Sequence, residues 1–496
     1  MKNERSSGIL LHITSLPGKY GIGTMGSDAY EFVDFLVASG QKIWQILPLG
    51  HTGYGDSPYQ CFSAFAGNPL LINLEKLTAE GLLEPSELPS EKDFGNDEVD
   101  FGQVFTYKYP LLRKAYERFK TNNEVVDRLR FENFHKKNQF WLPDYAFFMA
   151  MKNHFGGKAW SEWDAPIKKR ESEALRHYQQ HLADDIGFYS FLQFVFFRQW
   201  QQLKAYANLN DIKIIGDIPL YVAADSADSW ANPGIFEFDK NLNPVTVAGV
   251  PPDYFSETGQ LWGNPIYKWE VLQEQGFSWW IERVKANLVL YDIIRIDHFR
   301  GLAAYWSVPF GEKTAIKGVW VNAPGQSLLE ALYQGLGDLP IIAEDLGVIT
   351  PDVVELRDGF ELPGMKILQF AFDSGEENDF MPHTYVKNCV VYTGTHDNDT
   401  TRGQFKSVQD SDRLLMKEYF SVDERDPAWS FIKLAWSTVA NMAIAPLQDV
   451  LRLDTEARMN FPGKPSGYWK WRFRKEMLKP QHASELLKIT RLYGRR

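Results

Sequence analysis

The chain has little cysteine. Cys61 and Cys389 are its two thiols among 496 residues. Two cysteines cannot build the disulfide framework on which small secreted domains depend. A chain of this length also buries about three quarters of the surface that its unfolded form exposes, so its core needs no cross-links. The cysteine content therefore indicates a reducing compartment.

Long apolar runs are lacking as well. The most apolar stretch, 188–197, contains Ser190 and Gln193 and ends at Arg198, whereas a membrane-spanning helix needs about 20 apolar residues. The apolar run near the N-terminus is broken at His12, and no small-residue cleavage site follows it. This run is too short for a secretory signal peptide. We therefore expect a cytoplasmic protein without a membrane partner.

Positive charge is in deficit. Lys and Arg number 53 against 64 Asp and Glu, which gives a formal net charge of −11. Because nucleic-acid binding requires a basic field, nucleic acid is not an expected partner. The ten histidines form no H-E-x-x-H or Cys/His cluster, and the segment 397–402 (DNDTTR) has Arg402 where a calcium-binding loop needs glycine. The sequence thus predicts neither a metal nor a cofactor.

A glycine-rich segment at 21–26 (GIGTMG) fits the pattern of a dinucleotide-binding turn. Such a site needs an acidic residue about 20 positions further on, where the chain reads ILPLG at 46–50. A tight turn leading into a helix is the better interpretation. We expect Ser27 to cap this helix, which should run to Ala38.

Aromatic residues are abundant, at 15% of the chain. Most should belong to a large core, but several stand in segments rich in Gly, Pro and Asp. Examples are Tyr54, Tyr59, Tyr254, Phe255 and Trp262. Rings on loops offer flat apolar surfaces of the kind on which the C–H faces of sugars stack. The aromatic content therefore favours a carbohydrate ligand.

Eight short apolar segments alternate with predicted helices. This alternation is typical of a parallel sheet covered on both faces, and eight such units predict an α/β fold, a (β/α)8 TIM barrel. The strands are expected at 9–14, 42–47, 213–217, 292–297, 340–345, 365–370, 389–393 and 441–446, and helices at 186–208, 277–290, 325–336, 351–358 and 411–440.

One catalytic barrel should span the whole chain, 1–496, with large and mainly helical insertions between its strands. Residues 75–200 combine helical patterns with an acidic, proline-containing patch and lack a dense strand signal. We therefore expect a helical insertion subdomain there. A second insertion is expected at 221–275.

Acidic residues follow several of the predicted strands. Asp217, Asp297 and Glu344 end the third, fourth and fifth strands, and Asp397 follows the seventh. The active sites of such barrels lie at the carboxyl ends of the strands. A single acid there is more often a helix cap or an ion pair, but four on one rim favour a catalytic site.

Two of these acids have surroundings suited to different roles. Arg295 and Asp297 are two apart on a strand and share a face, so the guanidinium should orient Asp297 as a nucleophile. Apolar residues precede Glu344, and burial should raise its pKa toward that of a proton donor. Adjacent strand residues face opposite ways, so either Glu344 or Asp345 should enter the site. A nucleophile paired with an acid/base is what retaining glycosyl transfer requires.

The remaining groups at this rim suit a sugar ligand. Asp397 would be a third carboxylate against the positive charge that develops on the sugar in the transition state. His298 and His396 flank the acids and can donate hydrogen bonds to sugar hydroxyls. For each histidine a purely structural role is an equal alternative.

These residues carry a family resemblance. The segments 294–301 (IRIDHFRG), 343–347 (AEDLG) and 393–400 (TGTHDNDT) resemble the catalytic motifs of the α-amylase-like clan. Further segments narrow the resemblance to the amylomaltases, the 4-α-glucanotransferases of glycoside hydrolase family 77. They are 9–17 (ILLHITSLP), 57–60 (SPYQ), 216–222 (GDIPLYV), 249–256 (GVPPDYFS), 260–265 (QLWGNP) and 458–463 (RMNFPG).

The resemblance implies a function and a role for each motif. Asp297 would form a covalent β-glucosyl-enzyme, Glu344 would act as acid and base, and Asp397 would stabilise the transition state. Donor and acceptor would be α-1,4-glucans or maltooligosaccharides, with glucose also an acceptor, and the barrel would lack the C-terminal β-domain of the amylases. The implied substrate-binding residues are Ser57, Tyr59, Asp217, Tyr254, Phe255, Gln260, Trp262, Arg295, His298, His396 and Asn460.

The segment 250–265 would be a flexible loop over the acceptor side, with Trp262 as a stacking platform. Replacing Tyr254 and Phe255 with alanine should then raise hydrolysis relative to transfer. An α-glucan hydrolase is the alternative function, and it would convert maltotriose to shorter products alone. A glucan-binding scaffold without catalysis is less favoured, because both acids, at 297 and 344, are present.

Overall fold

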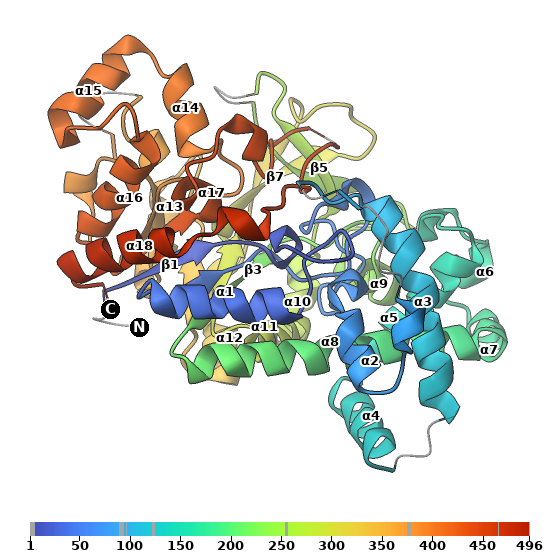
Figure 1. Ribbon diagram of the computed structural model, residues 1–496. Coiled ribbons are helices and arrows are strands. Elements are labelled where there is room, and N and C mark those ends of the chain that lie inside the picture. Colours follow the sequence, from blue (N-terminus) through green and yellow to red (C-terminus); the bar gives the residue numbers. More distant parts are fainter. Residues whose placement is uncertain are drawn as a thin grey trace.

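A computed structural model describes residues 5–88, 94–95, 97–121, 125–252, 256–373, 378–464 and 466–495. At its centre is an eight-stranded sheet of parallel neighbours in the order β10-β11-β12-β1-β2-β3-β6-β9 (Figure 1). Its strands are β1 (Ser6–Leu10), β2 (Ile43–Gln45), β3 (Lys213–Pro219), β6 (Ile293–Asp297), β9 (Ile341–Ala343), β10 (Gly364–Ile367), β11 (Cys389–Tyr392) and β12 (Met442–Pro446).

The two ends of this sheet meet and nearly close a barrel. The backbone N–H of Ala343, on β9, donates to the carbonyl of Pro363 at 2.9 Å. The N–H of Met365, on β10, donates to the Asp345 carboxylate at 2.7 Å. Every predicted strand segment overlaps a barrel strand, so the prediction of a (β/α)8 barrel is confirmed. The first strand begins earlier than predicted, at Ser6.

Helices outside the segment 101–181 lie around the barrel and its loops (Figure 1). They are α1 (Ser27–Ala38), α2 (Leu74–Ala79), α8 (Ala183–Leu209), α9 (Ala227–Ala231), α10 (Trp269–Glu274), α11 (Ser278–Leu290), α12 (Gly325–Leu336), α13 (Pro351–Gly359), α14 (Thr401–Ser407), α15 (Asp410–Phe420), α16 (Pro427–Ser437), α17 (Leu447–Val450) and α18 (Pro480–Leu492).

Two predicted helix details are wrong. The N-cap of α1 is Gly26, which makes no side-chain capping bond, and Ser27 is the first helical residue. The single helix expected at 411–440 is two helices, α15 and α16. The second begins at Pro427, whose ring suits the first turn of a helix but not its interior, and Asp426 caps it by accepting from the N–H of Trp429.

The segment at 101–181 forms a helical layer on one side of the barrel (Figure 1). Its helices are α3 (Phe101–Thr121), α4 (Val125–Lys137), α5 (Leu142–His154), α6 (Ala165–Lys168) and α7 (Ser172–His181). The long helix α8 joins this layer to the barrel. Its apolar first half, with Phe191 and Phe196 fully buried, packs against α5 and α3, and its second half contacts β3.

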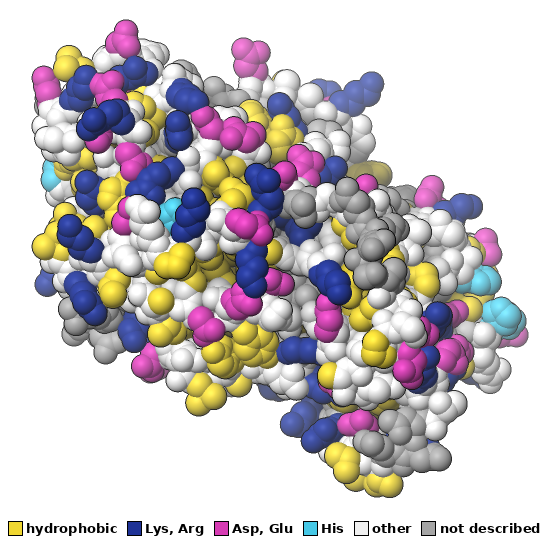
Figure 2. Space-filling view, viewed as in Figure 1, with side chains coloured by type: hydrophobic (Ala, Val, Ile, Leu, Met, Phe, Trp, Pro, Cys, Tyr) yellow, Lys and Arg dark blue, Asp and Glu magenta, His cyan; other side chains and the backbone are white. Residues whose placement is uncertain are grey.

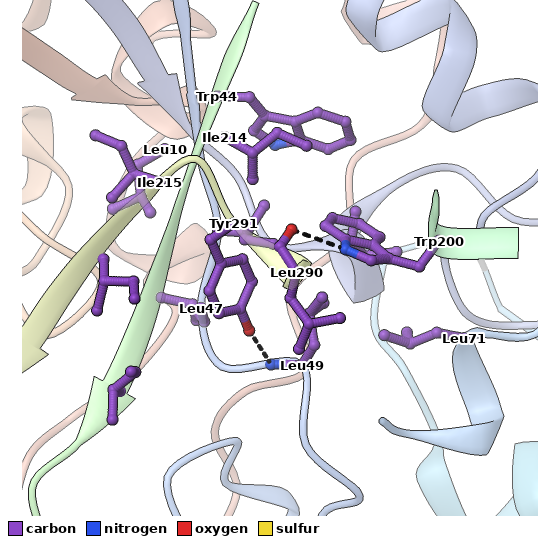
Figure 3. Packing of buried hydrophobic residues seen from close by; sticks show 14 of the residues in the cluster. Leu10, Trp44, Leu47, Leu49, Leu71, Trp200, Ile214, Ile215, Leu290 and Tyr291 are labelled. Atoms are coloured by element: carbon purple, nitrogen blue, oxygen red, sulfur yellow. Dashed lines mark hydrogen bonds between the residues drawn. The ribbon is translucent and has the colours of Figure 1, made fainter. Parts of the chain in front are cut away.

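Figure 3 shows Trp200, which belongs to α8, beside Leu290 at the edge of the barrel core. Trp200 on α8 is fully buried, and its Nε1 donates to the carbonyl of Leu290 at 2.9 Å. The hydroxyl of the next residue, Tyr291, accepts from the N–H of Leu49 at 3.4 Å. These bonds satisfy polar groups that would otherwise be buried unpaired among leucine and isoleucine side chains.

A second sheet lies beside the carboxyl ends of the barrel strands. Its antiparallel strands, in the order β5-β4-β7-β8, are β4 (Thr246–Val250), β5 (Gln260–Pro265), β7 (Ala304–Pro309) and β8 (Val319–Asn322). The strands β4 and β5 belong to the segment 221–275, while β7 and β8 follow β6. The sequence patterns predicted none of these strands.

Charges of both signs are interspersed over the face of the molecule seen in Figure 2. None of the helices in the described parts of the chain combines the length and the apolar character that crossing a membrane would take.

Candidate active site

The register of the barrel places Asp297 and Glu344 at one level, with Asp217 two residues lower on its strand. Asp217 on β3 is the pairing partner of Arg295 on β6, so their side chains stand next to each other. On the other side of β6, Ile296 pairs with Ala343 of β9. The next residues along these parallel strands are Asp297 and Glu344, which therefore lie level with each other at the carboxyl end of the barrel.

Arg295 links two of the acids. Its NH1 donates to Asp217 Oδ2 at 2.6 Å and to Asp297 Oδ1 at 2.9 Å. The Tyr59 hydroxyl also donates to Asp217 Oδ2, at 2.7 Å. Burial raises the pKa of Asp217 to about 7, although Arg295 and Tyr59 oppose the rise. The side chain of Asp297 is 29% exposed, so it can be reached by a ligand.

Glu344 is held by backbone donors. The N–H of His298 donates to Glu344 Oε2 at 2.6 Å, and the N–H of Leu346 donates to Oε1 at 3.2 Å. Burial raises the pKa of Glu344 well above its ordinary value; the charge of Asp297 adds to the rise and Arg295 opposes it. A carboxyl group in these surroundings holds its proton more firmly than a solvated one, as a general acid requires.

Asp345 faces away from these groups. Its carboxylate accepts from the N–H of Met365 at 2.7 Å and pairs with Arg357. As predicted from strand alternation, one of the two neighbouring acids joins the cluster while the other closes the barrel.

Asp397 follows β11, and its side chain is 43% exposed. Asn460 Nδ2 donates to Asp397 Oδ1 at 2.6 Å, and His396 Nε2 lies 3.5 Å from Asp397 Oδ2. Arg458 donates to the backbone carbonyls of Asp397 and Asn460, at 2.7 and 2.6 Å. The carboxylate is therefore oriented from both sides but open to a ligand.

Two groups of rings adjoin the acids. Tyr59 stacks on His396 with 5.3 Å between ring centroids, and Trp469 contacts both rings. The Trp262 ring meets His298 edge to face at 4.7 Å. His298 has a positive φ of 56°, which is uncommon outside glycine and typical of functional sites.

Several buried polar atoms at this site have no hydrogen-bond partner within the described residues. They are Asp217 Oδ1, His298 Nε2 and His396 Nδ1. Buried polar atoms are nearly always bonded in folded proteins, so unpaired atoms on facing side chains indicate groups that a hydroxylated ligand or a water molecule can satisfy.

Residues 11–478 match the protein family described as 4-alpha-glucanotransferase. The chain belongs to the 4-alpha-glucanotransferase family. It is 52% identical over 500 residues to the 4-alpha-glucanotransferase of Synechocystis, across 100% of this chain and 99% of that protein. The 4-alpha-glucanotransferase of Thermus thermophilus is 49% identical over 494 residues, across 98% of both chains.

A solved structure agrees with this membership. The amylomaltase from Streptococcus agalactiae in complex with acarbose superposes with a TM-score of 0.96 at 42% identity, over 99% of this chain and 100% of that one. The resemblance stated from the motifs is therefore confirmed, as are the barrel and the enzyme class, a 4-alpha-glucanotransferase.

The structure of this 4-alpha-glucanotransferase family member brings most of the predicted site residues together. Asp217, Asp297, Glu344, Asp397, Tyr59, Arg295, His298, His396 and Asn460 are linked by the contacts given above. Ser57 lies at the turn before Tyr59, where its Oγ accepts from the Tyr59 N–H at 3.2 Å. Gln260 accepts from Trp262 Nε1 at 3.2 Å. Tyr254 and Phe255 lie outside the described residues.

Sequence reasoning missed three residues of the site. Arg458 stands in a quoted motif, but no local pattern pointed to its contacts with Asp397 and Asn460. Trp469 carried no signal, because its ring reaches the site from a long irregular segment. His12 lines a small cavity together with His396. It could have been found, since it closely follows the first barrel strand, near whose carboxyl end site residues are expected.

Proposed function

We propose that this chain transfers segments of α-1,4-glucan from a donor to the 4-OH of an acceptor glucan or of glucose. The proposed route is a retaining double displacement through a covalent β-glucosyl-enzyme. The observation that carries the proposal is the pair of level carboxyl groups with opposite surroundings. Asp297 is partly exposed and bonded to Arg295, whereas Glu344 is buried with a raised pKa. Such division of roles is what retaining glycosyl transfer uses.

In the first step, Asp297 attacks the anomeric carbon of the donor. A bond forms between its carboxylate oxygen and that carbon as the bond to the leaving 4-oxygen breaks. Glu344 gives its proton to this oxygen, which leaves as a hydroxyl. Arg295 keeps the Asp297 carboxylate oriented through its 2.9 Å bond, and this orientation lowers the entropic cost of attack.

In the second step, the acceptor takes the place of the departed chain. Glu344, now ionised, removes the proton from the acceptor 4-OH, whose oxygen bonds to the anomeric carbon as the bond to Asp297 breaks. Both enzyme groups return to their starting state, and two inversions leave the new linkage in the α configuration.

Asp397 is proposed to hold the sugar at the scissile bond and to stabilise its developing positive charge. Asn460 fixes one of its oxygens at 2.6 Å. Tyr59, Asp217, His298 and His396 are proposed to line the same subsite, where the unpaired atoms of Asp217, His298 and His396 meet sugar hydroxyls. The segment 221–275 would supply the acceptor side through Gln260 and Trp262. The Trp262 ring can exclude water from the intermediate.

Substrates and location complete the proposal. The related Streptococcus agalactiae structure is described as a complex with acarbose, and we propose that this site also binds acarbose and maltooligosaccharides. The cytoplasmic location indicated by the cysteine content stays a prediction, as do the absence of a cofactor and of a metal.

Incubation with pure maltotriose tests this function. Transfer produces glucose together with maltotetraose and longer oligomers, which chromatography resolves, and NMR of the new linkage should show the α configuration. Labelled glucose should enter the reducing end of the products. Shorter products alone would establish a hydrolase instead, and a β linkage would exclude double displacement.

A further inference from the structure

A small cavity adjoins the His396 ring where β1 and β12 end. It has a volume of about 20 Å³, and its lining includes His12, Ser15, His396 and Gln448. One water molecule needs roughly 10–15 Å³ of such space together with at least two polar partners. The cavity therefore has room for a single water.

Two imidazole nitrogens provide the partners. His12 is 7% exposed and His396 is 6% exposed. Within the described residues, Nδ1 of each ring is buried without a hydrogen-bond partner. Because both rings line the same cavity, a water there can bond to both nitrogens, and these are the groups that a buried water usually satisfies.

The protonation states of the two rings fit such a bridge. Burial lowers the pKa of His12 to about 3, and the pKa of His396 is also lowered by burial. Both imidazoles are therefore neutral near pH 7, so each ring has one N–H donor and one acceptor nitrogen. Which nitrogen of a histidine carries the proton is decided by the hydrogen bond that the other nitrogen makes.

The choice matters at His396, since its Nε2 lies 3.5 Å from Asp397 Oδ2. A proton on Nε2 can be shared with the Asp397 carboxylate and with a sugar hydroxyl. A bare Nε2 would instead face the carboxylate with its lone pair and repel it. A water that donates to His396 Nδ1 selects the favourable tautomer.

We propose that His12 is a positioning residue that acts through one bridging water. His12 Nδ1–H donates to the water, and the water donates to His396 Nδ1, which keeps the proton of His396 on Nε2 and aims it at Asp397 and the bound sugar. The inference rests on the proposed role of the site, but the bridge itself is a property of the free protein.

Loss of an outer hydrogen-bond partner of a functional histidine typically costs ~10–100-fold in activity, as second-shell partners of metal-bound histidines show. We expect a loss of this size in kcat for transfer from maltotriose when His12 can no longer bond to the water. KM should change much less, because the aromatic stack and the carboxylates that hold the sugar remain.

The test compares His12→Asn with His12→Leu. The two replacements have the same branching and nearly the same size, so they disturb packing alike, but only the asparagine amide can replace Nδ1 in bonding to the water. His12→Leu should lose kcat and His12→Asn should recover most of it, at equal thermal stability. In ¹⁵N spectra of histidine-labelled free protein, the chemical shifts of the His396 ring nitrogens should show the proton on Nε2 in the native chain. These shifts should change in His12→Leu.

Three results would overturn the proposal. They are an equal kcat in the two variants, a His396 ring protonated on Nδ1 in the native chain, and a high-resolution crystal structure with no water within hydrogen-bond distance of both Nδ1 atoms. The spectra and the crystal structure are independent of catalysis. If maltotriose gave shorter products alone, the proposed function would fail while these two measurements still decided the bridge.

Discussion

Replacing Arg295 with methionine removes a positive charge that contacts both Asp217 and Asp297. Methionine keeps the unbranched apolar stem in a buried position, so the change acts mainly on charge. Both contacts are made by the same nitrogen, NH1, at 2.6 and 2.9 Å. Asp297 then loses the donor that orients it for attack on the anomeric carbon.

The size of the effect follows from Coulomb's law. Unit charges about 4 Å apart interact by about 4 kcal/mol at the effective dielectric constant of about 20 that suits such sites. Because roughly 1.4 kcal/mol corresponds to a factor of ten in rate, kcat/KM for maltotriose should fall by about 10³-fold. In Arg295→Lys one ammonium can replace the single nitrogen that makes both contacts, so this variant should recover a large part of the activity.

The pH dependence should change in a definite direction. Burial raises the pKa of Glu344 and of Asp217, and Arg295 opposes both shifts. Removing a neighbouring positive charge disfavours the ionised carboxylate, so both pKa values should rise further. The basic limb of kcat/KM, which reports loss of the proton from the acid, should therefore move to higher pH in Arg295→Met.

The assay follows glucose release from maltotriose between pH 4 and 9 for the native chain, Arg295→Met and Arg295→Lys. Arg472→Met is the control for loss of a buried guanidinium, since Arg472 bonds to the carbonyls of Leu16 and Gly18 and to no carboxylate in the described structure. It should lose stability but keep its kcat. Activity of Arg295→Met within tenfold of native, or a basic limb that stays in place, would refute the reasoning.

Glu344→Gln should lower transfer by roughly 10²–10⁴-fold, the usual contribution of a general acid, while Asp345→Asn next to it should keep the native kcat; comparable losses in both variants would contradict the assignment. Tyr59→Phe removes the 2.7 Å bond to Asp217, and since a hydrogen bond to a charged group contributes about 1.5–3 kcal/mol, kcat/KM should fall by about 10–150-fold in the same glucose-release assay. Trp262→Ala should raise hydrolysis relative to transfer, measured as reducing ends formed per glucose transferred, because it opens the wall against His298; an unchanged ratio would exclude this role for the ring.

Local patterns were enough to locate the barrel strands and the boundaries of most of the helices that were predicted. Each strand is a short apolar run, and in a sheet covered on both faces such runs are buried whatever the details of the loops. The split between α15 and α16 could also have been predicted, because an Asp followed by a Pro, as at Asp426 and Pro427, is typical of the first residues of a helix. The antiparallel strands β4, β5, β7 and β8 were not predicted. They lack the uniform apolar character of barrel strands, and the barrel strand β6 separates β4 and β5 from β7 and β8 along the chain.

The sequence by itself determined which residues stand at the carboxyl ends of the strands, because apolar runs and the residues after them are properties of the local chain. It thereby determined the candidates Asp217, Asp297, Glu344 and Asp397. Only the tertiary structure decided that Asp297 and Glu344 stand level, because that depends on the register between β6 and β9. The tertiary structure also decided that Trp469 and Arg458 reach the site, and that His12 shares a cavity with His396 almost 400 residues away. These contacts join segments far apart in the chain, and long-range packing rather than local preference selects them.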